Sequence, residues 1–377
     1  MKLALSLLCE NPLRKTGLTS LFVELVSRSL HQYNDLEWVV YIAPEHDWSV
    51  EHGRLTVVRD YAGSNQMKKR LLADHFKIGP DAKQRGVECL VTVGFVPIIT
   101  AGLPVAMHML SLQHLTKDNE VGFLRSVYRK WAASSGLAKA DLVITNTEFA
   151  ISQILEVNPE VKPKIIQSYE GLQHDFYGPD SEVGESERLK EKFGIEPGYL
   201  YWCSNFYPYK QAEKFFDAYA LLTKEEQGTL PIVMVGGGGW GDGFERAMDH
   251  AKELKIDQYV TKLGWVDDED LAALYRQSKF FVLASKEETF GRCVIESMAC
   301  GRPCVVNDIP VMHEVTDGHA LIVDFDKPKE ASEALRTLHT DAVKYEELAK
   351  GGVERVKAFD FDLLAKERIE AIKKLVS

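Results

Sequence analysis

The segment from residue 280 to residue 310 constrains the fold of this chain most, because it reads as a strand, a turn, a helix and a second strand in immediate succession. The runs FFVLAS (280–285) and PCVVND (303–308) are short and apolar, as buried parallel strands are. Between them, VIESMAC (294–300) has the spacing of a partly buried helix. Neighbouring parallel strands need such a crossover. The segment therefore predicts an open parallel sheet covered by helices.

The same alternation of apolar runs and helical patterns extends over the whole chain. The first half contains a helical pattern at 18–30 and the runs KLALSLLC, LEWVVYIAP, LTVVR, ECLVTVG, PVAMHML, DLVITNT and KIIQSYE. The second half contains YLYWCSN, PIVMVGG, VTKLGWV, KFFVLAS, PCVVND and ALIVDF. We therefore predict an α/β fold with two Rossmann-like doubly wound units. Ligands of such sheets bind outside the carboxyl ends of the strands, so two facing units would enclose a cleft.

Length and composition agree with two soluble domains. A chain of 377 residues exceeds what a single hydrophobic core usually serves. The polar stretch 179–191 lacks a strand and predicts a linker near residue 185, which gives domains 1–185 and 186–358 and a final segment 359–377. The apolar start, MKLALSLLC, is too short for a membrane span and is followed at once by Glu10, Asn11 and Pro12, so it is interpreted as a buried strand.

Charge and cysteine content exclude some classes of protein. A net charge of −11 argues against nucleic acid as the main partner, since phosphate neutralisation needs clustered cations. The six cysteines are scattered, with no Cys-x-x-Cys pair, which favours a reducing cytoplasm.

The turn at Thr289, Phe290 and Gly291 has the properties of a phosphate site. It follows a predicted strand and opens a helix, where unpaired N–H groups and the helix dipole attract anions. Glu288 precedes the turn and Glu296 follows it, with seven residues between the two carboxylates. Both can reach hydroxyl groups on either side of a bound diphosphate. The spacing predicts a sugar-nucleotide site.

This segment resembles the signature of retaining glycosyltransferases of the GT-B, twin-Rossmann type, family 4, also called glycosyltransferases group 1. The usual form is Glu-x-Phe-Gly, a few residues, then Glu-Ala-Met-Ala-x-Gly-x-Pro-Val-Val. Ten positions match it: Glu288, Phe290, Gly291, Glu296, Met298, Ala299, Gly301, Pro303, Val305 and Val306. The resemblance implies an acceptor-binding first domain, a nucleotide-sugar-binding second domain, a final helix (361–376) that packs back on the first domain, and no metal.

The resemblance also implies roles for residues at the start of the second domain. Lys210 falls on the family lysine whose ammonium lies against the donor diphosphate, so Lys210 and Glu288 are predicted to be catalytic. Asn205 stands where the family has arginine. Because the charge of the leaving group must be neutralised, Arg292, next to the phosphate turn, is a candidate substitute.

Two glycine turns resemble donor-contacting loops of the family. The run VMVGGGGWGDGFE (233–245) follows an apolar strand, and Gly237 and Gly238 are its predicted contacts. Gly17, in the turn RKTGLT (14–19), resembles the turn that closes over the donor phosphate, and Arg14 and Lys15 there can meet a charged acceptor. Base selection is expected to involve the loop at Trp265 and Val266.

Three further features have a functional and a structural explanation. His108 and His114 stand near a strand end where the family carries a sugar-contacting histidine, and His108 is the predicted catalytic one, although structural histidines are common there. The pair Asp324 and Asp326 has metal-binding spacing but matches an acidic rim loop of the family. The basic groups 68–70 and Arg125, Arg129 and Lys130 can meet anionic lipid, or can simply be solvated.

The resemblance therefore implies a metal-independent retaining hexosyltransferase of glycan biosynthesis. It would act on a nucleotide sugar, UDP- or GDP-linked, and on a saccharide or lipid-linked acceptor, in the cytoplasm or at the inner face of the membrane. Two alternatives remain open. One is a sugar-nucleotide epimerase or hydrolase on the same fold. The other is a non-catalytic nucleotide-sugar or glycan-binding protein, which the absence of arginine at position 205 keeps open, although the presence of both glutamates and Lys210 favours the enzyme.

Overall fold

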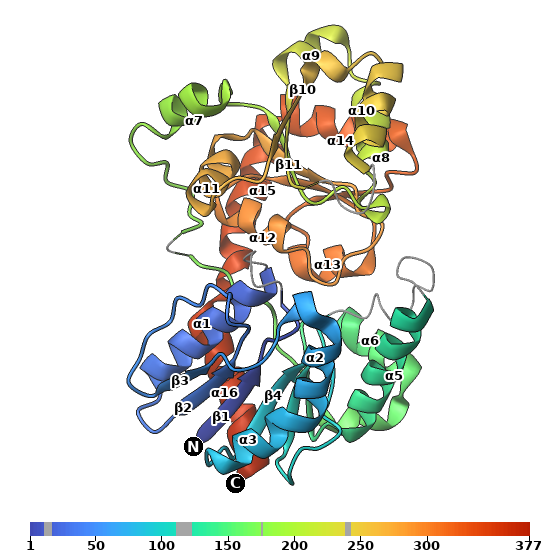
Figure 1. Cartoon of the computed structure of the whole chain (residues 1–377). Helices are drawn as coiled ribbons and strands as arrows, with labels where there is room; N and C mark the ends of the chain where they lie inside the picture. Colours follow the sequence, from blue (N-terminus) through green and yellow to red (C-terminus); the bar gives the residue numbers. More distant parts are fainter. Residues whose placement is uncertain (11–16, 111–122, 175, 238–242) are drawn as a thin grey trace. The chain divides into compact units, whose positions relative to one another are not determined.

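The structure is a computed structural model that describes residues 1–10, 17–110, 123–174, 176–237 and 243–377 (Figure 1). The described residues form two compact units, 1–171 with 361–377 and 172–360. Unit 1 contains a parallel sheet of seven strands in the order β3-β2-β1-β4-β5-β6-β7, and unit 2 contains one of six strands in the order β10-β9-β8-β11-β12-β13. The predicted α/β fold with two doubly wound units is confirmed.

Every predicted strand is present. The strands of unit 1 are β1 (Lys2–Ser6), β2 (Glu37–Tyr41), β3 (Leu55–Val58), β4 (Cys89–Val93), β5 (Val105–His108), β6 (Leu142–Thr145) and β7 (Ile165–Gln167). The strands of unit 2 are β8 (Leu200–Cys203), β9 (Ile232–Val235), β10 (Val260–Gly264), β11 (Phe280–Leu283), β12 (Cys304–Asn307) and β13 (Leu321–Val323). The apolar N-terminal run is thus a buried central strand, as predicted.

Helices connect these strands. In unit 1 they are α1 (Gly17–Gln32), α2 (Met67–Leu72), α3 (Ile78–Gln84), α5 (Phe123–Lys139), α6 (Glu148–Val157), α16 (Phe361–Val376) and the short helices η1 (Ser64–Gln66), η2 (Ala73–Lys77) and η3 (Pro159–Lys164). In unit 2 they are α7 (Glu185–Phe193), α8 (Ala212–Tyr219), α9 (Lys224–Thr229), α10 (Gly243–Glu253), α11 (Asp268–Gln277), α12 (Arg292–Ala299), α13 (Pro310–Thr316), α14 (Pro328–Thr340), α15 (Ala342–Arg355) and the short helices η4 (Pro208–Lys210), η5 (Asp257–Tyr259) and η6 (Val356–Phe359).

The pleat of the first sheet divides the core of unit 1 into two layers. Alternate residues of a strand point to opposite faces. Leu3 and Leu5 of β1 join the cluster formed with α1 and α16, whereas Ala4 joins the cluster formed with α3 and α5. The sheet is buried on both faces, as expected for a parallel sheet with crossover helices.

The final helix belongs to unit 1. Its apolar residues Ile369 and Ile372 pack in the same core layer as α1, and Arg28 of α1 donates a hydrogen bond to Asp362 over 2.9 Å. The guanidinium of Arg368 is buried and donates from Nε to the hydroxyl of Ser168 over 3.0 Å. These contacts fix α16 on the seven-stranded sheet (Figure 1).

The predicted boundary near residue 185 needs a correction. The change of unit falls between Gly171 and Leu172, so the polar stretch 179–191 lies within unit 2 and its second half forms part of α7. The cause is a buried ion pair, in which Arg276 of α11 donates from Nε to Glu185 over 2.9 Å. A stretch that is polar in sequence is therefore anchored in unit 2.

Candidate functional site

The predicted phosphate turn lies at the carboxyl edge of the six-stranded sheet. It follows β11 and leads into α12. Gly291 caps that helix with φ 90°, a left-handed conformation that glycine adopts without strain. A Cβ at this position would lie 2.5 Å from Cε of Met312, so the close packing also requires glycine. Phe290 is buried against Phe359, with ring centroids 5.5 Å apart, and its side chain anchors the turn.

Lys210 and Glu288 form an ion pair beside this turn. Lys210 Nζ lies 2.6 Å from Glu288 Oε1, and the side chains are 14% and 10% exposed. Burial opposes the charge on Lys210, but the Glu288 carboxylate raises the pKa of Lys210 above its usual value. The lysine is therefore a cation at neutral pH. A backbone hydrogen bond brings Lys210 and Glu288 together. The N–H of Lys286 donates to the carbonyl of Tyr209 over 2.8 Å and connects the loop after β11 to η4.

Glu296 lies in the first turns of α12, buried and doubly hydrogen-bonded. Tyr275 Oη donates to Glu296 Oε2 over 3.0 Å, and Arg292 Nε donates to Glu296 Oε1 over 3.1 Å. Burial raises the pKa of Glu296, although both partners favour its ionised form. The carboxylate is thereby fixed in orientation.

Arg292 is thus engaged by Glu296 through its Nε. Its proposed role as the substitute for the family arginine stays a prediction. Asn205 follows β8 at the same edge of the sheet, partly buried. In the loop after β9, a Cβ on Gly236 would lie 1.9 Å from the carbonyl oxygen of Ser204, and φ of Gly236 is 141°. That position permits only glycine, so the loop after β9 packs closely on the loop that carries Asn205.

The glycine loop after β9 approaches Trp265. A Cβ on Gly237 would lie 2.6 Å from Trp265 Nε1, and the indole is 63% exposed. Gly237 and Trp265 therefore lie against each other at the carboxyl edge of the sheet. Gly238 lies outside the described residues.

The structure places His108 away from any surface, which corrects its predicted role. It ends β5 with 0% exposure, and its ring packs edge-on against Phe22 of α1, with centroids 5.0 Å apart. Burial, with a contribution from Arg368, lowers its pKa well below the usual value, so it is a neutral core residue. The strand register explains the difference, because His108 is still paired within the sheet. His114 lies outside the described residues.

The structure describes some of the remaining predicted residues of unit 1 and not others. Gly17 begins α1, whereas Arg14 and Lys15 lie outside the described residues. Of the basic groups, residues 68–70 lie on α2, and Arg129 and Lys130 lie on α5; the side chain of Arg125 is not described.

The Asp-x-Asp pair after β13 lies at the surface. Asp326 pairs with Lys214 over 3.1 Å and Asp324 with Lys327 over 3.5 Å. Across the described ranges, no three His, Cys, Asp or Glu side chains gather as a metal site would require. The six cysteines are all described and all free.

One contact of the site was missed by sequence reasoning. Tyr275, which hydrogen-bonds Glu296, lies in the last turn of α11, a helix of ordinary amphipathic pattern. Its only sequence signal is a large aromatic residue next to a predicted strand, which does not reveal a partner on another helix.

Comparisons with known proteins agree with this geometry. Residues 185–355 match the family model of the glycosyl transferases group 1. The O-antigen chain mannosyltransferase B of Escherichia coli is 27% identical over 251 residues, and the N-acetyl-alpha-D-glucosaminyl L-malate synthase of Bacillus anthracis is 30% identical over 241 residues. These alignments cover 66% and 62% of this chain, but only 64% and 58% of the relatives, less than two thirds of their length.

Solved structures share the fold over almost the whole chain. The sucrose-phosphate synthase of Thermosynechococcus elongatus has a TM-score of 0.78 at 18% identity, with coverage of 99% of this chain and 98% of the other. The Anabaena protein HepE, in complex with UDP and glucose, has a TM-score of 0.77 at 16% identity, with 99% coverage of both chains. The fold is that of the GT-B glycosyltransferases.

Proposed function

We propose that this protein transfers a hexose from a nucleoside diphosphate sugar to a hydroxyl group of a growing glycan or lipid-linked saccharide, with retention at the anomeric carbon and without a metal ion. The observation that carries the proposal is the charged Lys210, fixed by Glu288 beside a glycine-capped phosphate turn. The relatives named as glycosyltransferases and the UDP complex of the Anabaena protein support a UDP- or GDP-linked donor.

Each charged residue has a distinct role in this mechanism. The Lys210 ammonium and the N–H groups that open α12 stabilise the negative charge that develops on the departing diphosphate. Glu288 orients hydroxyl groups of the sugar near the reacting carbon. Glu296, fixed by Tyr275 and Arg292, accepts hydrogen bonds from the ribose hydroxyls. Trp265 and the neighbouring glycine loop offer a surface for the base.

Retention follows from a front-face reaction. The anomeric C–O bond to the diphosphate breaks, and the acceptor oxygen forms its bond to the same face of the sugar. The departing diphosphate oxygen takes the proton of the acceptor hydroxyl, so no separate base is required.

The test begins with thermal unfolding in the presence of UDP-, GDP- and ADP-sugars. A donor at a hundredfold excess over its dissociation constant stabilises the folded state by about 2.7 kcal/mol. The stabilising donor, labelled in its sugar, is then incubated with saccharide acceptors with and without EDTA. We expect acceptor-dependent transfer in both, with the anomeric configuration of the donor preserved in the NMR spectrum of the product.

Other outcomes identify the alternatives. Epimerised or free sugar formed without acceptor would mean an epimerase or a hydrolase. Stabilisation by a donor that is never consumed would mean a binding protein. Loss of transfer in EDTA would contradict the metal-independent mechanism.

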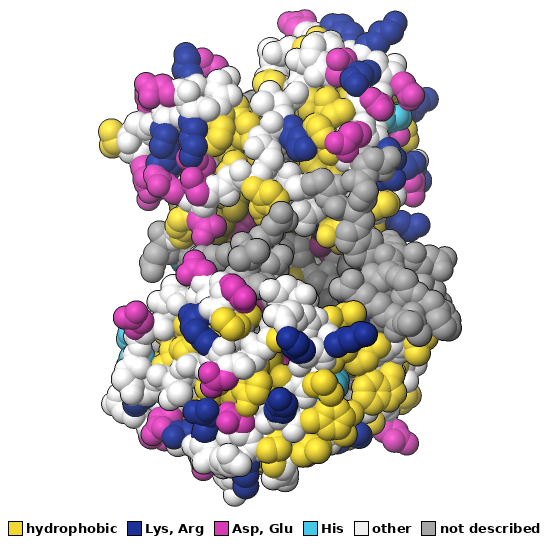
Figure 2. Space-filling view, viewed as in Figure 1, with side chains coloured by type: hydrophobic (Ala, Val, Ile, Leu, Met, Phe, Trp, Pro, Cys, Tyr) yellow, Lys and Arg dark blue, Asp and Glu magenta, His cyan; other side chains and the backbone are white. Residues whose placement is uncertain are grey.

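We also propose that unit 1 associates with an anionic membrane surface. Nine large apolar side chains in the described part of unit 1 are at least 42% exposed. Two of them are Val157 and Leu363, and the other seven are Met67, Leu72, Phe76, Ile98, Ile99, Val127 and Trp131. Several belong together, because Trp131 and Phe76 both contact the ring of His75 and Ile99 N–H donates to the carbonyl of His75. Lys68, Lys69 and Lys77 are exposed alongside. Figure 2 shows apolar and basic side chains gathered on this unit. In the described residues, no helix is long and apolar enough to cross a bilayer.

Vesicle sedimentation tests this association. We expect the protein to bind vesicles that contain anionic phospholipid more tightly than purely zwitterionic ones, since basic residues add to the apolar contribution. The double substitution Phe76→Ser with Trp131→Ser should weaken binding about tenfold or more, from the loss of buried apolar surface. Val343→Ser, at an 81% exposed residue of unit 2, is the matched control. Equal binding by both variants would contradict the proposal.

A further inference from the structure

A cavity lies at the edge of the six-stranded sheet opposite to the donor residues. It has a volume of about 470 Å³. Its lining includes Gly198, Lys279 and Arg302, which precede β8, β11 and β12, whereas Asn205 and Glu288 follow β8 and β11. Because all these strands are parallel, the cavity and the donor site lie at opposite ends of the sheet. The size is that of a pocket for a small molecule.

The cavity carries uncompensated positive charge. Lys279 and Arg302 line it, and neither forms an ion pair with a carboxylate among the described residues. A third cation, Arg276, is neutralised by Glu185. The one acidic lining residue, Glu346, pairs with Lys350 over 3.4 Å. Two unpaired cations in one cavity are unexpected in a chain with a net charge of −11.

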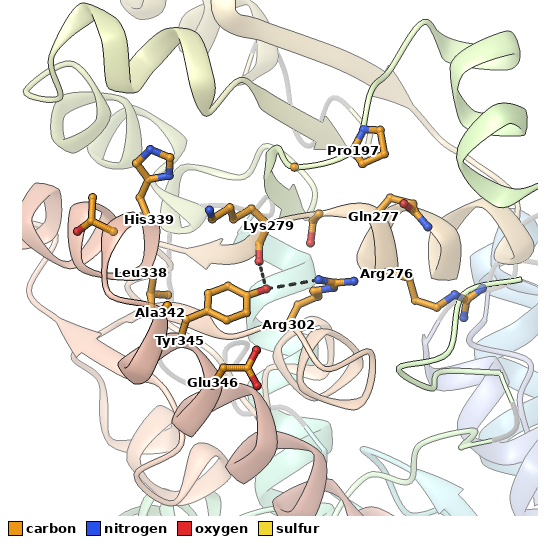
Figure 3. Close-up of a pocket in the computed structure, with 13 residues that line it drawn as sticks. Pro197, Arg276, Gln277, Lys279, Arg302, Leu338, His339, Ala342, Tyr345 and Glu346 are labelled. Carbon is orange, nitrogen blue, oxygen red and sulfur yellow. Dashed lines mark hydrogen bonds between the residues drawn. The ribbon is translucent and has the colours of Figure 1, made fainter.

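Tyr345 links the backbone of Lys279 to the side chain of Arg302. Its hydroxyl donates to the carbonyl of Lys279 over 2.7 Å and accepts from Arg302 Nη1 over 3.4 Å (Figure 3). The backbone of Arg302 is fixed as well, because its N–H donates to the carbonyl of Ser297 over 3.0 Å. The Arg302 guanidinium is therefore preorganised, so less conformational entropy is lost when it binds a ligand.

Polar atoms around the cavity have unused hydrogen-bonding capacity. Arg302 Nε and His339 Nδ1 are buried and have no hydrogen-bond partner among the described residues. Unpaired buried polar atoms are rare in folded proteins and destabilise them. Gln277 and Thr340 add polar groups to the lining, and Leu338 and Pro197 add apolar surface. Such a mixture suits a ligand with an anionic end and a less polar body.

We infer that this cavity binds a small soluble phosphate ester, whose phosphate lies between Lys279 and Arg302. Arginine and lysine together neutralise a phosphate dianion, and the planar guanidinium can donate two parallel hydrogen bonds to its oxygens. The inference does not depend on the proposed transferase function, because it concerns a different edge of the sheet.

Calorimetric titration with glucose 6-phosphate tests the inference, with unphosphorylated glucose as the comparison. The titrations use the full-length Lys210→Ala variant, so that binding of phosphate to the donor site is weakened. We expect the phosphate ester, and not glucose, to bind. In this background, Lys279→Gln and Arg302→Gln should each weaken binding about tenfold or more, as expected for the loss of a charge-assisted hydrogen bond. Lys329→Gln, which removes an exposed lysine of α14, should leave it unchanged.

Three results would overturn the inference: no binding of glucose 6-phosphate, equal binding of glucose, or unchanged binding by both cavity variants. Inorganic phosphate provides a second probe, and competition between it and glucose 6-phosphate is expected. Thermal unfolding of each variant shows whether it is folded, and Lys279→Gln keeps the inference testable should Arg302→Gln unfold.

Discussion

Replacement of Lys210 by alanine is expected to lower kcat for sugar transfer by roughly two to three orders of magnitude. Removal of one preorganised donor to developing negative charge has about this effect in other enzymes. The ammonium lies 2.6 Å from Glu288, and both side chains are largely buried. Its attraction for a bound diphosphate is therefore stronger than it would be in water. The measurement is steady-state kinetics with the donor identified by thermal shift.

Lys214→Ala is the matched control for this prediction. Lys214 lies one turn further along, on α8, but pairs with Asp326 at the surface. Its loss should change kcat less than twofold. Glu288→Ala should resemble Lys210→Ala, and Asn205→Ala should have a smaller effect. Undiminished transfer by either Lys210→Ala or Glu288→Ala would exclude the proposed mechanism.

The sequence was sufficient to predict the fold because the signal is repeated. Thirteen apolar runs alternate with helical patterns, and each run became a strand of one of the two sheets. A parallel sheet buried on both faces requires nearly continuous apolar strands, which sequence displays directly. The segment around Glu288 was likewise predictable, because its residues are neighbours in the chain and one turn positions them.

Contacts between distant residues were not predictable in the same way. Tyr275 and Glu296 meet across two helices, and nothing in either local pattern indicates this contact. His108 was misplaced for a related reason: a strand end is uncertain by a few residues, and this uncertainty decides whether a side chain faces a site or the core. Because Asn205 lacks the positive charge of the family arginine, the sequence predicts that Arg292 supplies it. The sequence does not show that Arg292 already donates a hydrogen bond to Glu296.

Glu185→Ala is expected to destabilise unit 2 by about 3 to 5 kcal/mol, the usual effect of leaving one partner of a buried ion pair unpaired. Glu185 and Arg276 are 1% and 5% exposed, and Gln277 also donates to Glu185, over 2.9 Å. Without the carboxylate, the Arg276 guanidinium remains buried with its charge uncompensated. Thermal unfolding should show a midpoint lower by roughly 10 °C for the transition of unit 2.

Two variants separate loss of the pair from loss of a helix residue. Glu187→Ala removes an exposed carboxylate from the same turn of α7 and should shift the midpoint little. The double substitution Glu185→Leu with Arg276→Met removes both charges and should recover much of the stability, since an apolar pair of similar volume avoids the cost of burying charge. If Glu185→Ala were no less stable than Glu187→Ala, the segment before α7 would be a linker after all, as its polar sequence first indicated.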